Sequence, residues 1–423
     1  MSNTSPTHVV GLVDGNNFFV SCERLFRPDL QHKPVVVLSS NDGCVVARSQ
    51  EVKDMGIPMG VPYFQIKDII KDKQVTVFSS NFTLYRDLSR RVFSVVRNIC
   101  KTFEQYSIDE GFFLVPAAEA EAVGWQIKDT IARTLGMPVS VGLASSKTLA
   151  KYAGTLAKRG RGVCFLSSAD WAVCAPTVGL GDVWGVGAQR LRAFTEAGLQ
   201  TAADLMVADS ALVRRRFGVE GARLQLELQG VSAYAVAIAP KLQQSIMHSR
   251  SFRSATKRRS VVEAAVAHHV RRGVEDLLER GLCAQYLTVA IRSSRYERNA
   301  PGWGSEGVCL PIPTADLFML MQTAQAMLTR LYQTDVAYQK AGILLSGLVP
   351  ATMVTAGTLW GESLVARQRK AVASTVAQLN QRFGSDAIQV GYYAPATTWQ
   401  ARQDVRSPAY TTRWNMLARV SAR

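Results

Sequence analysis

Two adjacent carboxylates in an aromatic hairpin constrain this chain more than any other stretch. Phe103 and Tyr106 precede the pair Asp109 and Glu110, and residues 112–114 that follow are aromatic or aliphatic. This composition predicts two short, half-buried strands that meet at a turn. Neighbouring acids repel one another unless a cation neutralises them, and oxygen ligands favour Mg²⁺ or Mn²⁺. Taken alone, a solvated hairpin tip is the simpler interpretation.

A second acidic strand end lies near the start of the sequence. The apolar run 9–13 ends in Asp14, and a turn-prone Gly-Asn-Asn leads into a helical pattern that begins at Phe18. Ligand sites form where buried strands end. The competing interpretation is a helix cap formed by Asp14 or Asn16. Asp14 together with the hairpin acids would supply the three carboxylates that two-metal phosphoryl or nucleotidyl transfer requires.

Charge and cysteine content narrow the class of protein. The chain has 423 residues, a formal net charge of +16 and 47% hydrophobic residues. Length predicts roughly three domains, and the positive charge predicts a polyanionic partner, most often nucleic acid, with no membrane partner. Seven cysteines without a C-x-x-C pair are typical of a reduced, cytoplasmic protein. The adjacent His268 and His269 have no metal-ligand spacing and are interpreted as structural.

Hydrophobic periodicity predicts two successive α+β segments separated by helices. The first has a strand and helix within 8–30, then helix 81–101, the acidic hairpin, helix 118–135, strand 139–143 and helix 146–158. Residues 31–79 form an insertion with strands 35–38 and 44–47 and a helix at 48–54, and 168–235 are helical. The second has strand 245–252, helix 260–280, strands 284–292 and 306–312, helix 315–332 and strand 339–347. Another helix is expected at about 363–383.

Three local patterns suggest contacts with phosphate groups. Gly185 and Gly187 before a helix form a helix-hairpin-helix pattern, in which glycines permit close approach of backbone N–H groups to DNA phosphates. Arg250 and Arg253 lie in a basic stretch, 241–259, that would track a nucleic acid backbone unless it is ordinary surface charge. The helix that begins near Ser146 is expected to direct its first N–H groups toward a phosphate.

Several stretches, taken in order, carry a resemblance to a known family. They are residues 14–23, 33–38, 41–48, 107–110, 147–151, 182–187, 249–252 and 407–413. Together they resemble the Y-family lesion-bypass DNA polymerases of the UmuC type, the catalytic subunit of bacterial DNA polymerase V. The resemblance covers nearly the whole chain.

The resemblance implies an α+β, right-hand polymerase. It has a ferredoxin-like βαββαβ palm (1–30 and 80–167), small fingers (31–79) and a helical thumb with the helix-hairpin-helix (168–240). A βαββαβ little-finger domain (241–349) follows, and then a C-terminal UmuC-type tail (350–423). The tail is expected to serve partners and to be dispensable for the palm.

The resemblance also implies roles for individual residues. Asp14, Asp109 and Glu110, with the Gly15 carbonyl, would hold two Mg²⁺, and Mn²⁺ is a possible substitute. The triphosphate would contact Lys53, Lys158 and the backbone N–H groups of Phe18 and Phe19; Lys158 would otherwise be a cation favoured by its helix C-terminus. Gly43 and Cys44 would cover the nascent base pair. Phe19 would be a steric gate against ribonucleotides, unless it is a core residue of its helix.

Partners follow from the same resemblance. They are primer-template DNA, dNTPs, a processed UmuD-type dimer, RecA and a sliding clamp, with a role in the SOS response and association with the nucleoid. Of the clamp-binding stretch only Leu359 and Trp360 fit, since Ala356 replaces the usual Gln. Alternatives are a stand-alone polymerase IV-like enzyme, a palm-fold nucleotidyl cyclase and a non-catalytic DNA-binding subunit.

Overall fold

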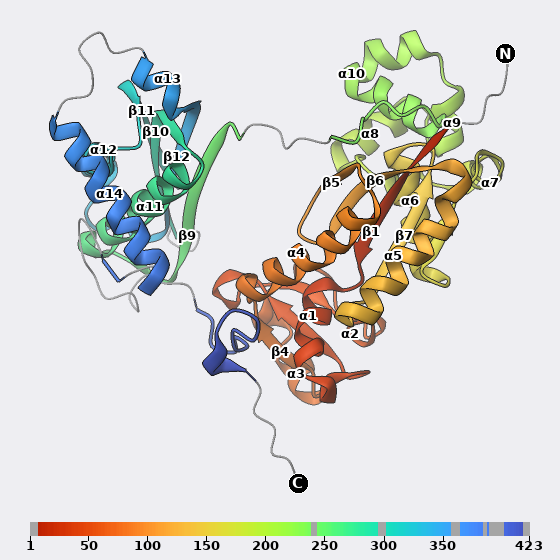
Figure 1. The fold of residues 1–423 in the computed structure, drawn as a ribbon, viewed down its shortest axis with the longest axis horizontal. Coiled ribbons are helices and arrows are strands. Elements are labelled where there is room, and N and C mark those ends of the chain that lie inside the picture. The colour runs from red at the N-terminus through yellow and green to blue at the C-terminus, as the bar shows by residue number, and fades with distance from the viewer. Residues whose placement is uncertain are drawn as a thin grey trace. The chain divides into compact units, whose positions relative to one another are not determined.

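The chain folds into two compact units. The computed structural model describes residues 7–237, 243–294, 302–356, 364–383, 387–388 and 402–417. Unit 1 contains Met1–Ser39, Gly43–Pro240 and Val405–Arg423, and unit 2 contains Ser40–Asp42 and Lys241–Asp404 (Figure 1). None of the helices in the described ranges has the length and apolar character needed to cross a membrane.

Unit 1 contains the N-terminal strands and helices. Its strands are β1 (His8–Gly15), β2 (Val35–Leu38), β3 (Val45–Arg48), β4 (Thr76–Ser79), β5 (Phe103–Gln105), β6 (Glu110–Pro116), β7 (Val139–Ala144) and β8 (Val163–Phe165). Its helices are α1 (Phe18–Phe26), α2 (Gln50–Asp54), α3 (Lys67–Asp72), α4 (Phe82–Ile99), α5 (Ala120–Leu135), α6 (Lys147–Arg159), α7 (Ser168–Cys174), α8 (Ala188–Glu196), α9 (Ala202–Val207) and α10 (Ser210–Leu228).

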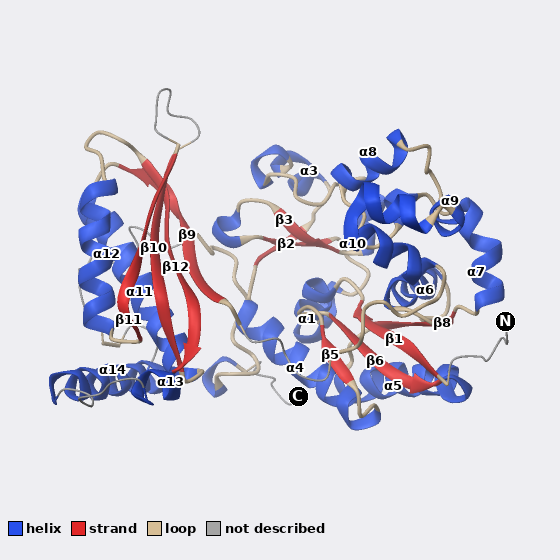
Figure 2. Ribbon diagram, turned by 90° about the horizontal axis from the view of Figure 1, so that it is seen from above, coloured by secondary structure: helices blue, strands red, loops and turns tan. Residues whose placement is uncertain are grey.

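The main sheet of unit 1 has the order β5-β6-β1-β7-β8, antiparallel except for the β7–β8 pair. The elements β1, α4, β5, β6, α5 and β7 therefore form the predicted ferredoxin-like βαββαβ arrangement. Val13 and Phe113 lie in one core cluster with residues of α4 and α5, and Leu12 and Phe112 lie in another with residues of α6. The sheet is thus covered on both faces (Figure 2).

Helix α6 packs unusually close to the sheet. A Cβ at Gly142 of β7 would lie 2.1 Å from the backbone nitrogen of Gly154 in α6. Only a glycine at position 142 permits this approach. The close packing fixes the height of α6 over the strands, and with it the positions of the lysines that α6 carries.

Two smaller parts complete unit 1. The segment around β2 forms a sheet of order β3-β2-β4, in which β2 is antiparallel to β3 and parallel to β4, with its own core of Val36, Val52 and Ile70. Helices α7 to α10 pack on the α6 side of the main sheet, where Trp171 and Leu224 join the same cluster as Leu149.

Unit 2 contains a four-stranded sheet with helices on one face. Its elements are β9 (Ser245–Thr256), α11 (Arg259–Glu279), β10 (Leu282–Ser293), β11 (Trp303–Thr314), α12 (Leu317–Leu331), β12 (Tyr338–Pro350), α13 (Ala351–Ala356) and α14 (Leu364–Phe383). The predicted second βαββαβ succession is present, but the strand order is β11-β10-β12-β9. Here the fourth strand lies between the first and second, whereas in unit 1 the first lies between the third and fourth.

The C-terminal stretch 350–423 is divided between the units. Helix α14 contributes Ala373 to the core of unit 2. Val405–Leu417, called the return segment below, packs instead on unit 1, where Ser407 is buried. The expectation that the palm is independent of the tail stays a prediction, and the packing of this segment on unit 1 argues against it. Such a long-range contact leaves no periodic pattern in the sequence.

Candidate active site

The three predicted carboxylates lie at one end of the main sheet of unit 1. Asp14 and Glu110 are directly opposite one another in the antiparallel pair β1–β6. The Gly15 N–H donates to the Asp109 carbonyl at 2.9 Å, which brings the turn against the end of β1. Side chains opposite one another in such a pair lie about 5 Å apart. Strand pairing therefore explains why acids 96 residues apart in sequence meet.

Ser107 organises the turn that carries the acids. Its hydroxyl accepts hydrogen bonds from the Asp109 and Glu110 backbone N–H groups at 3.1 and 2.9 Å. The same hydroxyl donates to Asp109 Oδ1 at 2.6 Å. Serine hydroxyls commonly satisfy turn N–H groups in this way. Sequence reasoning gave Ser107 no role.

A row of lysines on α6 neutralises the acids at the strand ends. The Nζ atoms of Lys147, Lys151 and Lys158 lie 2.6, 2.6 and 2.7 Å from carboxylate oxygens of Glu104, Glu110 and Asp14, respectively. Only Lys158 was predicted as a functional residue. The spacing of four and seven residues places all three lysines on one helix face, which is the signal that sequence reasoning missed.

The surroundings of Asp14 raise its pKa. Burial, which leaves 8% of the residue exposed, raises its pKa to about 6, against the attraction of Lys158 and with added repulsion from Glu110. Among the described residues, no three Asp, Glu, His or Cys side chains are arranged to hold a metal ion. The ammonium groups of Lys151 and Lys158 supply the positive charge at these carboxylates.

A second cationic group lies beside Asp14. Burial and repulsion from Arg48 and Lys158 lower the pKa of Lys53, and attraction to Asp14 opposes that change. Lys53 is on α2 and Arg48 ends β3, so these cations approach the main-sheet carboxylates from the neighbouring small sheet. Besides burial, repulsion among these cations thus contributes to the lowered pKa of Lys53. A cluster of mutually repelling cations is suited to bind an anion such as a triphosphate.

The start of α1 does not use the caps that the sequence offered. Its N-cap is Asn17, in the left-handed conformation with φ 47°, and no side chain caps the helix. Asn16 Oδ1 accepts from the Ser140 hydroxyl at 2.9 Å, and Asp14 pairs with Lys158. The first-turn N–H groups of a helix have no intrahelical acceptors, which makes them suited to bind phosphate. These are the N–H groups of Phe18 and Phe19.

The two phenylalanines have different environments. Phe18 is 4% exposed and belongs to the core, whereas Phe19 is half-buried and packs at its edge. The Phe19 ring stacks on Tyr85 of α4 with centroids 4.5 Å apart and an interplanar angle of 14°. Phe18 is therefore a core residue, whereas Phe19 packs against the core and stays partly exposed, so both interpretations of Phe19 remain predictions.

Gly43 and Cys44 lie in the loop between β2 and β3. The Gly43 carbonyl accepts from Tyr63 N–H at 2.8 Å, and the Cys44 N–H donates to the Ser39 hydroxyl at 3.1 Å. Gly43 is exposed and Cys44 half-buried. Gly43 and Cys44 are therefore held by hydrogen bonds of their backbone groups and present little side-chain volume.

The predicted helix-hairpin-helix turn contacts the acidic hairpin. Trp184, before Gly185, packs against the rings of Tyr106 and Phe112 with centroids 5.6 and 6.0 Å away. Lys151 Nζ lies 5.6 Å from the Trp184 centroid. Gly185, at φ 89°, and Gly187, the N-cap of α8, are both exposed.

The predicted phosphate role of the α6 N-terminus is wrong. Ser146 caps α6, with its hydroxyl accepting from the Leu149 N–H at 3.3 Å. The N–H of Thr148 donates to Glu227 Oε2 at 2.9 Å, and Glu227 is fully buried on α10. A carboxylate of the protein itself therefore occupies this helix end.

In unit 2, the two predicted arginines differ in position. Arg250 lies on the same helix-covered face of β9 as the buried Ile246 and Phe252 and is half-buried, whereas Arg253 is exposed. Arg292 of β10 and Lys340 of β12 are direct partners in the β10–β12 ladder, and sequence reasoning did not single them out. The predicted clamp residues Leu359 and Trp360 lie outside the described residues.

Comparison with known proteins places these features in context. Residues 13–155 match the impB/mucB/samB family, residues 243–357 match the C-terminal domain of that family, and residues 370–420 match a domain of unknown function (DUF4113). ImpB of Salmonella typhimurium is 34% identical, covering 95% of this chain and 97% of its own length. UmuC of the same species is 32% identical, covering 97% and 99%.

More distant relatives share the fold. DNA polymerase IV of Corynebacterium diphtheriae is 30% identical and covers 80% of this chain and 75% of its own length. A Y-family DNA polymerase chimera of Dbh and Dpo4 has a TM-score of 0.66 at 19% identity, covering 81% of this chain and 99% of its own. An insertion ternary complex of Dbh DNA polymerase has a TM-score of 0.54 at 18% identity, covering 81% and 99%.

Proposed function

This chain belongs to the impB/mucB/samB family of Y-family DNA polymerases and is a DNA-directed DNA polymerase, and we propose that it performs error-prone translesion synthesis by two-metal nucleotidyl transfer. The observation that carries the mechanism is the register pair of Asp14 and Glu110, with Asp109 in the adjoining turn. Asp14 and Glu110, each paired with a lysine, and the adjoining Asp109 would suit a centre that exchanges cations once their side chains converge on the ion.

Asp14, Asp109 and Glu110, with the Gly15 carbonyl, are the residues that would hold two Mg²⁺. Their oxygen-only donor set suits this ion, and the ion pairs of Glu110 and Asp14 with lysine ammonium groups, at 2.6 and 2.7 Å, support a site for cations. Bound there, Mg²⁺ supplies Lewis acidity to a primer hydroxyl and neutralises charge on the triphosphate.

Lys158 has two partners in this proposal. Lys158 pairs with Asp14 when that carboxylate has no other cation. With Mg²⁺ at Asp14, Lys158 would bind the triphosphate together with Lys53 and the neighbouring Arg48. The N–H groups of Phe18 and Phe19 bind phosphate oxygens at the start of α1. Phe19 excludes ribonucleotides with its ring alone, since it carries no phenolic hydroxyl.

The loop of Gly43 and Cys44 covers the nascent base pair with little side-chain volume. A small, loosely fitting cover tolerates a distorted template base and lowers fidelity, since selection then rests on a poorly shaped pocket. In this proposal residues 1–30 and 80–167 act as palm, 31–79 as fingers, 168–240 as thumb and 241–349 as little finger.

The DNA backbone is gripped outside the catalytic centre. The N–H groups near Gly185 and Gly187, and the basic side chains of unit 2, bind phosphates without reading sequence. We further propose that the chain works as the catalytic subunit of a polymerase V-like complex in the SOS response, with a processed UmuD-type dimer, RecA and a sliding clamp.

Primer extension on an intact and a lesion-containing template tests the proposal. The purified chain, with its partners, is expected to add dNTPs opposite the lesion in the presence of Mg²⁺. Asp109→Ala and Glu110→Ala are expected to abolish addition and to keep DNA affinity within about twofold, because phosphate contacts elsewhere supply affinity. Glu119→Ala, at an exposed acid, is the matched control. Normal extension by either hairpin variant would overturn the site, and synthesis of cyclic nucleotides without a template would favour a cyclase.

A further inference from the structure

The return segment adds an edge to the small sheet of unit 1. Arg406 forms a parallel bridge with Ser79 at the end of β4. The Ser79 N–H donates to the Val405 carbonyl at 3.1 Å, and the Val405 N–H donates to the Ser79 hydroxyl at 3.2 Å. A segment more than 300 residues away in sequence thus becomes part of the N-terminal unit. It falls within the matched domain of unknown function.

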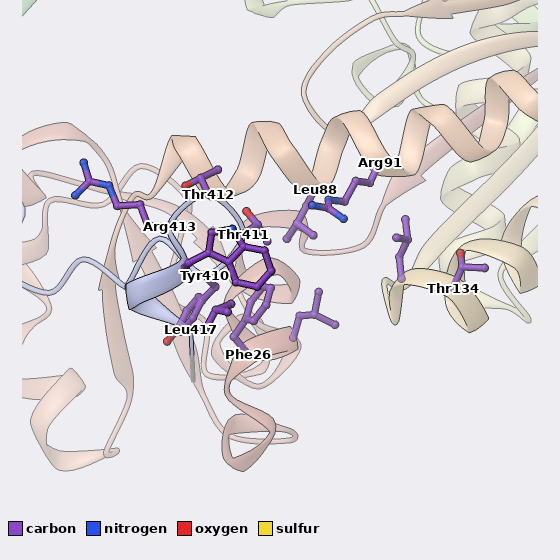
Figure 3. Close-up of a pocket in the computed structure, with 12 residues that line it drawn as sticks. Phe26, Leu88, Arg91, Thr134, Tyr410, Thr411, Thr412, Arg413 and Leu417 are labelled. Carbon is purple, nitrogen blue, oxygen red and sulfur yellow. The ribbon is translucent and has the colours of Figure 1, made fainter. Parts of the chain in front are cut away.

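Beyond this bridge, the return segment forms one wall of a pocket whose other walls are α1, α4 and the end of α5 (Figure 3). The Tyr410 ring stacks on Phe26 at the end of α1, with centroids 4.6 Å apart and an interplanar angle of 9°. The side chain of Asn81, which caps α4, donates to the carbonyls of Ser407 and Pro408 at 3.1 and 3.2 Å. These contacts hold the segment at both helices.

Ser407 reaches a buried carboxylate in the core of unit 1. Its hydroxyl accepts from Asn81 Nδ2 at 3.0 Å and donates to Glu23 Oε1 at 3.1 Å. Glu23 is wholly buried on α1, and in the described part of the chain its Oε2 has no hydrogen-bond partner. A buried carboxylate with few donors depends strongly on each of them.

The other donor to Glu23 leads to the proposed sugar gate. The Tyr85 hydroxyl donates to the same Oε1 at 2.6 Å. The Tyr85 ring stacks on Phe19, and Phe82 packs edge-on against both rings with centroids 5.6 and 6.0 Å away. Ser407, Glu23, Tyr85 and Phe19 therefore form a continuous series of contacts from the return segment to the half-buried edge of Phe19.

We propose that the return segment positions Phe19 through Ser407, Glu23 and Tyr85, and so sets how strictly the polymerase rejects ribonucleotides. The inference rests on the proposed function, in which Phe19 lies against the sugar. Steric exclusion depends on small displacements of a ring, and two hydrogen bonds to one oxygen fix the height of the Tyr85 ring beneath it. Ser407 and Tyr85 are thus positioning residues.

A purely structural role predicts a different result. Loss of a buried hydrogen bond would lower the fraction of folded enzyme, and it would reduce kcat for a ribonucleotide and for its deoxy counterpart equally. A positioning role changes the ratio of the two kcat/KM values. That ratio is independent of the amount of active enzyme, so it separates the two roles.

The experiment measures this ratio on one template base for wild type and six variants, of which four are single changes around the return segment and two carry Phe19→Ala. Ser407→Ala and Tyr85→Phe are expected to raise the ribonucleotide-to-deoxynucleotide ratio about fivefold, the factor associated with one ordinary hydrogen bond. Ser407→Thr keeps the hydroxyl and is expected to restore the wild-type ratio. Tyr410→Leu removes the ring contact with Phe26 and keeps the hydrogen bond between Ser407 and Glu23. It is therefore expected to lower thermal stability and to leave the ratio unchanged.

Phe19→Ala separates failure of this inference from failure of the proposed function. Phe19→Ala is expected to raise the ratio more than Ser407→Ala does. The double variant Phe19→Ala/Ser407→Ala is expected to have the same ratio as Phe19→Ala alone. If Phe19→Ala raises the ratio and both Ser407→Ala and Tyr85→Phe leave it unchanged, the inference is wrong and the gate stands. If Phe19→Ala itself has no effect, the nucleotide does not lie over α1 and the proposed function fails at that point.

Discussion

Asp14 and Glu110 face one another across the β1–β6 ladder, and each carboxylate binds a lysine of α6. Burial raises the pKa of Asp14 to about 6. The ionised form of this carboxyl group therefore lowers the free energy of unfolding. If Asp14 has the proposed catalytic role, function and stability oppose one another at this residue, as is common where charges are concentrated for catalysis.

Asp14→Asn is expected to stabilise the metal-free protein at pH 8. Because the folded-state pKa of Asp14 is raised from 3.8 to about 6, its contribution to stability is present below pH 3.8 and is lost as the pH rises through about 6. Asparagine avoids that loss, and the free energy of unfolding is expected to rise by about 1–3 kcal/mol. Denaturant unfolding at pH 8 and pH 4 measures the change.

The gain from Asp14→Asn is expected to vanish at pH 4, and Mg²⁺ is expected to stabilise wild type more than the variant. Asp68→Asn, at an exposed acid on α3, is the control and is expected to change neither value by more than about 0.5 kcal/mol. A gain of equal size at both pH values would show that ionisation of Asp14 is not its cause.

The two arginines of β9 are expected to differ in their effect on DNA binding. Arg253 is exposed, whereas Arg250 is half-buried on the helix-covered face. Arg253→Ala is expected to weaken binding on any sequence and to reduce the slope of log K against log salt by about one unit. Arg250→Ala is expected to lower thermal stability and leave the slope unchanged. The reverse pattern would mean that the DNA contacts the helix-covered face.

Alanine substitutions at the two glycines of the predicted helix-hairpin-helix turn are expected to have different effects, one on DNA affinity and the other on protein stability. A Cβ at Gly187 would meet no atom within 4 Å, whereas Gly185 has φ 89°. Gly187→Ala is expected to keep the melting temperature and to weaken DNA binding several-fold, because the added methyl group stands between the backbone and a phosphate. Gly185→Ala is expected to cost about 1 kcal/mol of stability. Unaltered affinity of Gly187→Ala would show that DNA does not contact this turn.

Removal of the return segment is expected to destabilise unit 1. Deletion of 405–423 leaves the buried Asn81 and Glu23 without Ser407 and Phe26 without Tyr410. The free energy of unfolding is expected to fall by about 2–4 kcal/mol, since several buried hydrogen bonds contribute ~1 kcal/mol each. Deletion of 418–423 keeps the segment and is the control. Identical melting curves for the two truncations would show that the packing is not stabilising.

What the sequence predicted was chiefly local. The apolar face predicted for helix α4 consists of Tyr85, Leu88, Val92, Val95, Val96 and Ile99. Val95 and Ile99 are half-buried, and the other four are buried. The strand ends at Asp14 and Glu110 were recognisable because an apolar run stops at an acid or resumes after one. Periodicity carries this information, since each element has its own repeat.

What the sequence did not predict depends on partners far away along the chain. Glu227 fills the N-terminus of α6 because α10 lies there, and Ser107 binds the turn N–H groups only once the hairpin has formed. Likewise, unit 2 shares its order of elements with the sheet of unit 1 but not its strand order. Sequence patterns identify which strands exist, and register and packing decide which become neighbours.

The position of the return segment also sets the order of events on the ribosome. About 160 residues separate the earlier part of unit 1 from Val405, and at ~5–20 residues per second their synthesis takes roughly 10–30 s. During that interval Glu23 lacks its Ser407 donor, and the aromatic cluster of Phe19, Phe82 and Tyr85 lacks its final support. A nascent chain, or one ended early by a stop codon, therefore lacks part of the support of Phe19, and under the proposed gate role nucleotide discrimination would be complete only at the end of translation.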